Sequence, residues 1–468
     1  MFIGRLDELE FLNSKYKSDN AEFIVIYGRR RIGKTELIKE FIKDKPHILY
    51  TAVQMTDKVQ LKKISDIVFN YFKDKRYSET FSSWENVFQY ISDTCGEGEK
   101  LVFVIDEFPY LVDSNSSIPS ILQKVWDHHL KNKNIIFIIS GSSMSFMEKE
   151  ILGEKNPLYG RASGIYKLQE LDFFSAKEFI PKKNLAQAIT YYSIYSGVPH
   201  YLNQINNNKT LGENIKNSII KNGAILFNEA EFLLKQELRD VCSYNSIIEA
   251  IALGNTRLND IYTKTEIEKN KLPYYLGNLI DLNIIKREFP VTIKTKEKSK
   301  SRIGIYKLSN SYFRFYYAFV YPNISELLEG DADIIYEEMI EPNLDYFVSF
   351  DFEKVCIQYM RKLNKERKLP FRFTKIGRWW NKDNEIDIVA FDTKGNYIFG
   401  ECKWRNKKTG FKEIRALKEK SRNFENDASE NYFVIFSKSG FTEELIHLGE
   451  DDKKVMLVDI SKMKQIDD

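Results

Sequence analysis

Short, uninterrupted apolar runs mark the first third of the chain. They lie at 23–27, 101–105 and 135–139, and helical patterns separate them. Continuous apolar strands that alternate with helices are typical of a parallel sheet covered on both faces. Residues 1–175 are therefore predicted to form an α/β core. Residues 176–235 follow with mostly helical patterns, which predict a helical subdomain.

The pattern changes after residue 235. Three helical stretches precede two β-type stretches, at 243–253, 257–262, 267–285, 288–294 and 303–308. Seven of the residues from Lys286 to Arg302 are basic and two are acidic. Three helices followed by a basic two-stranded ribbon predict a winged helix-turn-helix over 236–322. Such a module contacts DNA in some proteins and packs against protein in others.

The last part of the chain is again α/β in pattern, after a linker at 323–344. The range 345–468 is predicted to begin with a helix at 345–364. Strands at 370–376, 385–391, 396–403 and 431–436 follow, with a basic helix at 411–424. These patterns predict a separate C-terminal domain.

Composition places the chain among soluble proteins of several domains. It has 468 residues and a net charge of +3, so global charge alone does not indicate a nucleic-acid partner. None of the four cysteines are at CxxC spacing, and few scattered cysteines fit a reducing cytoplasm. No apolar run approaches the roughly 18 residues of a membrane span. We expect a cytoplasmic protein without a membrane partner.

A phosphate-binding loop follows the first apolar run. Its eight residues match GxxxxGKT and stand between a strand and a helix, as this motif requires: Gly28, Arg29, Arg30, Arg31, Ile32, Gly33, Lys34 and Thr35. The backbone N–H groups of such a loop can surround phosphates. Lys34 is expected to reach the β- and γ-phosphates of ATP, and Thr35 to bind Mg²⁺.

Two carboxylates end the second apolar run. Asp106 is expected to hold Mg²⁺, and Glu107 to orient the water that attacks the γ-phosphate. Ser140, at the end of the third run, is a candidate sensor of that phosphate. Ser142 and Ser143 are alternatives for the same role.

An ordered set of motifs resembles the archaeal-type STAND ATPases, which are relatives of AAA+ and replication-initiator ATPases. The set begins with Phe2-Ile3-Gly4-Arg5 and Glu8, and continues with the phosphate loop and Asp106-Glu107-Phe108. Ser140-Gly141-Ser142, Pro157-Leu158-Tyr159-Gly160-Arg161 and Gly197-Val198-Pro199 follow.

The resemblance covers about residues 1–320 and implies roles for several of these residues. It places Gly4 and Arg5 near the adenine, and Arg161 near the γ-phosphate as a charge sensor or finger. It also implies that Gly197-Val198-Pro199 is a hinge beside the nucleotide.

The C-terminal unit carries a second candidate centre. Asp387, Glu401 and Lys403 have D-x₁₃-E-x-K spacing, and alternation along a strand places Glu401 and Lys403 on one face. Asp387 meets them if 385–391 and 396–403 form a hairpin. Two carboxylates could then hold Mg²⁺, and Lys403 could position a water or stabilise the charged phosphate. Glu353, on the helix before these strands, could add a ligand.

This spacing resembles the PD-(D/E)xK nuclease superfamily, with Ile386 where the motif name has proline. The sequence thus favours an ATPase that acts on DNA through a winged helix and a metal-dependent nuclease-like domain. The alternative is an ATP-driven switch whose C-terminal domain is a non-catalytic interaction module, and which self-associates or binds proteins.

Overall fold

The structure is a computed structural model that describes residues 2–73, 80–95, 98–422, 424 and 430–464. Parts of the predicted domains 1–175 and 345–468, and residue 423 of the helix predicted at 411–424, therefore lie outside the described residues. The chain divides into two compact units. The first comprises 1–171 and 198–200, and the second comprises 172–197 and 201–468.

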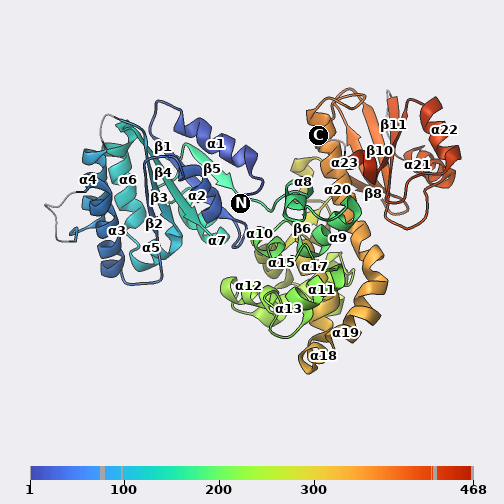
Figure 1. The fold of residues 1–468 in the computed structure, drawn as a ribbon, viewed down its shortest axis with the longest axis horizontal. Helices are drawn as coiled ribbons and strands as arrows, with labels where there is room; N and C mark the ends of the chain where they lie inside the picture. Colours follow the sequence, from blue (N-terminus) through green and yellow to red (C-terminus); the bar gives the residue numbers. More distant parts are fainter. Residues whose placement is uncertain (1, 74–79, 96–97, 423, 425–429, 465–468) are drawn as a thin grey trace. The chain divides into compact units, whose positions relative to one another are not determined.

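A five-stranded parallel sheet forms the centre of the first unit (Figure 1). Its order is β2-β3-β4-β1-β5, with the strands β1 (Glu22–Tyr27), β2 (His47–Thr51), β3 (Leu101–Asp106), β4 (Ile135–Gly141) and β5 (Gly164–Lys167). The three apolar runs are β1, β3 and β4, and every residue in them is buried. The parallel sheet predicted from those runs is confirmed. The edge strands β2 and β5 were not predicted, because β2 alternates in burial and β5 has no buried residue.

Helices cover both faces of this sheet. One face packs on α1 (Leu6–Tyr16) and α2 (Lys34–Ile42). The other packs on the longer set α3 (Asp57–Phe72), α4 (Trp84–Thr94), α5 (Phe108–Ser114) and α6 (Ile118–His128). The short helices η1 (Leu130–Asn132), α7 (Met144–Phe146) and η2 (Met147–Ile151) complete the unit.

The second unit begins with short helices, as the sequence predicts for 176–235. They are α8 (Phe173–Ala176), η3 (Lys177–Phe179), α9 (Leu185–Tyr195), α11 (Leu211–Ile215), η4 (Lys216–Ile220) and α12 (Glu229–Glu237). The short helix α10 (Pro199–Leu202) begins in the first unit and ends in the second. The start of α9 is fixed by a capping box. The Asn184 side chain accepts from the Gln187 N–H, and the Gln187 side chain accepts from the Asn184 N–H.

Three helices and a two-stranded antiparallel ribbon come next, in the predicted order. The helices are α13 (Val241–Ala252), α14 (Leu258–Thr265) and α15 (Leu272–Asp281), and the ribbon pairs β6 (Ile285–Glu288) with β7 (Ile305–Leu308). The strand predicted at 288–294 is wrong, because β6 ends at Glu288. Residues 289–304, called the ribbon loop below, include the short helix α16 (Thr295–Lys298).

The range 323–344, predicted to be a linker, is largely helical. It follows α17 (Ser311–Phe315), η5 (Tyr316–Val320) and η6 (Tyr321–Asn323), and contains α18 (Ile324–Glu329), α19 (Ala332–Ile334), η7 (Ile335–Ile340) and η8 (Glu341–Asn343). The chain then enters the long helix α20 (Leu344–Lys365), which was predicted at 345–364.

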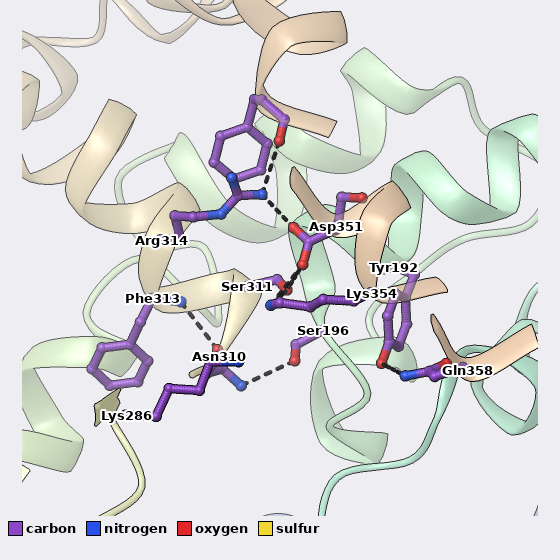
Figure 2. A network of polar contacts seen from close by, with 12 residues as sticks. Tyr192, Ser196, Lys286, Asn310, Ser311, Phe313, Arg314, Asp351, Lys354 and Gln358 are labelled. Carbon is purple, nitrogen blue, oxygen red and sulfur yellow. Dashed lines mark hydrogen bonds and ion pairs between the residues drawn. The ribbon is translucent and has the colours of Figure 1, made fainter. Parts of the chain in front are cut away.

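A buried polar network joins α17 to α20 (Figure 2). The Asp351 carboxylate of α20 accepts from Ser311 Oγ at 2.6 Å and lies 2.8 Å from Lys354 Nζ. The Arg314 guanidinium of α17 forms an ion pair with the same carboxylate. One carboxylate thus binds three groups, and this fixes α20 against α17.

The C-terminal sheet has the order β12-β11-β10-β9-β8. Its strands are β8 (Lys375–Trp380), β9 (Glu385–Phe391), β10 (Asn396–Lys403), β11 (Glu430–Ser437) and β12 (Val455–Asp459). β9 is antiparallel to both β8 and β10, whereas β10, β11 and β12 run parallel. The helices α21 (Phe411–Arg422), α22 (Glu443–Asp451) and α23 (Ile460–Lys464) accompany them. The hairpin expected between 385–391 and 396–403 is confirmed, and β12 was not predicted.

Candidate functional site

The phosphate loop links β1 to α2, as predicted. Two of its glycines are required by the backbone. Gly33 has φ 90°, in the left-handed region. At Gly28 a Cβ atom would lie 2.6 Å from the carbonyl oxygen of Leu168. The loop can therefore pass close to β5, and α2 begins at Lys34 with its N-terminus open to an anion.

Lys34 and Arg5 hold the loop from two sides. Lys34 is buried, and its Nζ donates to the carbonyl oxygens of Gly28 at 2.9 Å and Arg29 at 3.1 Å. Arg5 is also buried and donates from Nη2 to the carbonyl oxygen of Ile32 at 2.8 Å. Gly4 precedes it with φ 68°. The N-terminal element that carries the family resemblance thus contacts the loop directly.

The two serine candidates bind different carboxylates. Ser140 is fully buried and donates from Oγ to Asp106 Oδ1 at 2.7 Å. Ser142 donates to Glu107 Oε2 at 2.8 Å. Ser140 therefore orients Asp106, and Ser142 orients Glu107, which has φ 53° at the end of β3.

The residues expected to bind Mg²⁺ converge at this edge of the sheet. Thr35 Oγ1 donates to Asp106 Oδ2 at 2.7 Å. A hydroxyl and a carboxylate are the hard oxygen ligands that Mg²⁺ prefers. Thr35 and Asp106 are therefore the residues that would hold Mg²⁺.

The three loop arginines have distinct surroundings. Arg30 donates from Nη2 to the Tyr110 hydroxyl at 3.0 Å, and Arg29 Nη1 lies 3.7 Å from Glu170 Oε1. Arg31 is exposed and has φ 69°. The segment 198–200 belongs to the first unit, and Pro199 Cγ would lie 3.8 Å from a Cβ atom on Gly33. Pro199 of the predicted hinge segment therefore lies beside the phosphate loop.

Arg161 is not brought to the phosphate loop. It lies three residues before β5, whose first residue Gly164 pairs with Ile24 near the start of β1. Arg161 is therefore at the amino ends of the strands, whereas the loop follows their carboxyl ends. Its guanidinium forms a 2.8 Å ion pair with Asp127 and donates to the Pro157 carbonyl. Arg161 therefore does not lie beside the phosphate loop, although the resemblance implies a position near the γ-phosphate of the nucleotide.

The second candidate centre forms in the C-terminal sheet, where the predicted residues meet. Asp387 Oδ2 accepts from the backbone N–H of Cys402 at 2.8 Å, between Glu401 and Lys403. Lys403 Nζ lies 2.6 Å from Glu401 Oε1. Burial, followed by the charge of Glu401, raises the pKa of Asp387 to about 6.

Side-chain cations occupy the carboxylates of this centre. Glu401 also binds Lys420 Nζ of α21, at 3.1 Å. Glu353 of α20 lies 3.1 Å from Arg378 Nε of β8. Among the described residues, no group of three or more carboxylates, histidines or cysteines is placed to hold a metal ion. As arranged, the side chains do not fit the expected Mg²⁺ site of Asp387, Glu401 and Glu353.

Two of these cations were not predicted as partners of the centre. Lys420 belongs to the basic helix predicted at 411–424. Arg378 stands directly before Trp379 and Trp380 at the end of β8. These ion pairs join α21 to β10 and β8 to α20. Hydrophobic periodicity does not predict which elements lie side by side, so the sequence could not indicate them.

Comparisons with known proteins support an ATPase domain in the first part of the chain. A family described as an ATPase domain predominantly from Archaea matches residues 2–205. A family of archaeal and bacterial proteins of unknown function matches residues 316–417. No helix in the described part of the chain is long and apolar enough to cross a membrane.

Two relatives and one solved structure are informative. An uncharacterized protein of Methanocaldococcus jannaschii, MJECL04, is 37% identical over 94% of this chain and 96% of its own length. An ATP-binding protein of the same organism, MJ0423, is 53% identical over 10% of this chain and 76% of its own length. The Walker-type ATPase PABY2304 of Pyrococcus abyssi has a TM-score of 0.51 at 19% identity, covering 68% of this chain and 96% of that one. That likeness shows a shared fold.

Proposed function

We propose that this chain, which belongs to the same archaeal family as MJECL04 and carries an archaeal-type ATPase domain, uses ATP to control an action on DNA. The ATPase core is 1–175, followed by a helical subdomain at 176–235 and a winged helix at 236–322. The nuclease-like domain is 345–468. The observation that carries the proposal is the junction of Lys34, Thr35 and Asp106 at the carboxyl edge of the parallel sheet.

Each residue of the nucleotide site has a role in this proposal. The loop N–H groups and Lys34 would bind the phosphates of ATP, and Arg5 would hold the loop. Mg²⁺ on Thr35 and Asp106 would neutralise charge on the β- and γ-phosphates. Glu107, oriented by Ser142, would position the attacking water.

A substitution of the loop lysine tests this part. We expect Lys34→Ala to lower ATP hydrolysis at least about 100-fold, because electrostatic stabilisation of the transferred phosphoryl group is lost. Lys39→Ala is the matched control, since Lys39 lies on the same helix and is exposed. Phosphate release measures both. Equal rates for wild type and Lys34→Ala would exclude this site as the source of hydrolysis.

The ribbon loop is the proposed DNA contact. Five exposed basic side chains extend from it: Lys294, Lys296, Lys298, Lys300 and Arg302. The helix α15, which holds the place of the recognition helix in a winged helix, contains neither lysine nor arginine and exposes Tyr274 and Ile280. Because phosphate contacts come mostly from lysine and arginine, the loop fits a DNA backbone better than the helix does.

Salt dependence tests this contact. In the triple variant Lys296→Gln, Lys298→Gln and Lys300→Gln, we expect weaker binding to duplex DNA. The slope of log K against log salt should be smaller by about 2 to 3. Lys62→Gln with Lys63→Gln, two exposed lysines of α3, is the control. An unchanged slope in fluorescence anisotropy would remove the ribbon loop from the DNA surface.

The order of elements from α20 to β11 supports the nuclease-like part. The helix α20 is followed by the antiparallel strands β8, β9 and β10, then by the helix α21, and then by β11, which pairs parallel to β10. Asp387, Glu401 and Lys403 meet on its central hairpin, as a PD-(D/E)xK centre requires.

A second candidate function keeps the ATP switch and makes the C-terminal domain a non-catalytic module for protein contact or self-association. The pairing of Glu401 with Lys403 and Lys420 favours it, because those contacts leave the carboxylate no free oxygen. Cleavage that is lost in Glu401→Gln would decide for the nuclease. Nucleic-acid or protein binding without cleavage would decide for the module.

A further inference from the structure

Arg30 is held in the phosphate loop by a neutral group. Its Nη2 donates to the Tyr110 hydroxyl at 3.0 Å. Its Nε is buried and has no hydrogen-bond partner within the described ranges of the chain. No carboxylate that the structure describes forms an ion pair with it. A guanidinium has five N–H donors and keeps its proton in proteins, so one hydroxyl does not compensate the charge of Arg30.

The other cations of the loop have different surroundings. Arg29 Nη1 lies 3.7 Å from Glu170 Oε1, so this arginine faces an acidic group. Arg31 is exposed to solvent. Lys34 is buried and donates to two carbonyl oxygens of the loop. Arg30 is half-buried, and a cation that is withdrawn from water needs an anion close to it.

Tyr110 ties Arg30 to the turn that follows β3. This tyrosine lies one helical turn after Glu107, and its backbone N–H donates to the Glu107 carbonyl oxygen at 3.0 Å. Gln60 of α3, which is fully buried, donates from Nε2 to the Tyr110 carbonyl oxygen at 3.2 Å. The Arg30 side chain is therefore bound to the turn that carries the residue proposed to position the attacking water.

Phosphate is the anion that this loop is proposed to bind. Arg30 stands between Gly28 and Lys34 in the loop, whose N–H groups would surround the phosphates of ATP. Guanidinium groups bind phosphate oxygens with two parallel N–H donors. Bound ATP would therefore supply the negative charge that the described residues do not give to Arg30.

We propose that Arg30 is a catalytic residue that stabilises the negative charge of the γ-phosphoryl group during ATP hydrolysis, and that Tyr110 is the positioning residue that holds it. The proposal rests on the ATPase function proposed above. It gives Arg30 the role that the resemblance implies for Arg161, which does not lie beside the loop.

The hydrolytic step explains how a cation in the loop accelerates the reaction. Water attacks the γ-phosphorus, and the bond from that phosphorus to the bridging oxygen breaks, with its electron pair leaving on ADP. One proton of the water stays on the released phosphate, and the other leaves through Glu107. Because negative charge spreads over the three terminal oxygens in this step, Arg30 stabilises the transition state more than it stabilises bound ATP.

Phosphate release and nucleotide binding by the full-length protein test this role. We expect Arg30→Gln to lower kcat at least about 100-fold, because the cation that stabilises the γ-phosphoryl group is lost. Its affinity for ADP should stay within about threefold of wild type, since ADP has no γ-phosphate. Arg30→Lys keeps the charge without the planar fork and should fall between the two. Lys39→Gln, which removes an exposed lysine of α2, is the control for the loss of one positive charge.

Aluminium fluoride gives a readout that does not depend on turnover. With ADP and Mg²⁺ it imitates the γ-phosphoryl group in the transition state. It should tighten ADP binding by wild type and by Lys39→Gln, and in Arg30→Gln this tightening should be at least about tenfold smaller. Titration calorimetry measures it. Tyr110→Phe should lower kcat about fivefold, the effect of one lost hydrogen bond, and leave ADP affinity unchanged.

The outcomes separate the role of Arg30 from the function on which it rests. Hydrolysis by Arg30→Gln at the wild-type rate overturns the catalytic role and keeps the ATPase. Loss of ADP affinity in Arg30→Gln, in step with its loss of hydrolysis, also overturns that role, because Arg30 then only supports the loop. A wild type that binds no ADP and releases no more phosphate than Lys34→Ala overturns the ATPase function and the role of Arg30 together.

Discussion

At the scale of single residues, the ATP site is organised by hydrogen bonds to two neighbouring carboxylates. Asp106 accepts from Thr35 and Ser140, whereas Glu107 accepts from Ser142. The sequence predicts the carboxylates and the loop, because motif and strand context agree. The sequence does not show which serine binds which carboxylate, because Ser140, Ser142 and Ser143 lie within four residues. Their partners depend on the direction of each hydroxyl group.

Substitution of each serine tests which carboxylate it orients. We expect Ser140→Ala and Ser142→Ala to lower ATP hydrolysis by about 10- to 100-fold, the usual effect of removing a group that orients a metal ligand or catalytic carboxylate. Ser143→Ala is the control. Stopped-flow phosphate release and nucleotide titration are the measurements. A large loss of nucleotide affinity in Ser142→Ala, with hydrolysis per bound ATP unchanged, would contradict its role on Glu107.

At the scale of elements, α20 links the C-terminal sheet to the rest of the second unit. Asp351 on this helix is fully buried, and its pKa is lowered. Burial acts to raise that pKa, but the charges of Arg314 and Lys354 and the Ser311 hydroxyl lower it further than burial raises it. The folded carboxyl group therefore releases its proton at a lower pH than the unfolded one, whose pKa is about 3.9.

This shift gives a prediction with a definite sign. The stabilisation by Asp351 is fully present above about pH 4 and is lost as pH falls through the folded pKa. Asp351→Asn should cost about 3 kcal/mol at pH 7, since it leaves Arg314 and Lys354 without their partner. The difference from wild type should shrink below about pH 4. Hydrogen exchange of the α20 amides measures it, with Arg361→Gln at an exposed position of the same helix as control. A difference that grows toward low pH would contradict the network.

The elements also show which features the sequence could predict. The boundaries of β9 and β10 were predicted correctly, because each is a run of apolar and β-branched residues that a glycine-containing turn separates. The first strand of the ribbon was predicted at 288–294, whereas β6 comprises Ile285–Glu288. Residues 289–304 contain the β-branched Val291, Thr292 and Ile293, but their loop lies on β8 and does not pair with β7. The tertiary contact therefore overrides local propensity. For the same reason no pattern could place Arg161 beside Asp127.

At the scale of the whole molecule, two compact units carry two candidate centres, and the central claim is that ATP at one controls DNA chemistry at the other. The residues Lys34 and Glu401 belong to different units, so a dependence on both cannot arise from one site alone. The ATPase unit is supported by its family and fold. The C-terminal centre brings Asp387, Glu401 and Lys403 together, and two lysines pair with the Glu401 carboxylate.

The most direct test is cleavage of labelled single-stranded, duplex and branched DNA in Mn²⁺ or Mg²⁺, with and without ATP. Wild type, Lys34→Ala and Glu401→Gln are compared, and ATP turnover is measured in the same samples. We predict cleavage that responds to ATP, is lost in Glu401→Gln, and loses its ATP response in Lys34→Ala. If no DNA is cut while ATP turnover persists and depends on Lys34, the central claim is contradicted, and the C-terminal domain is a binding module on an ATP switch.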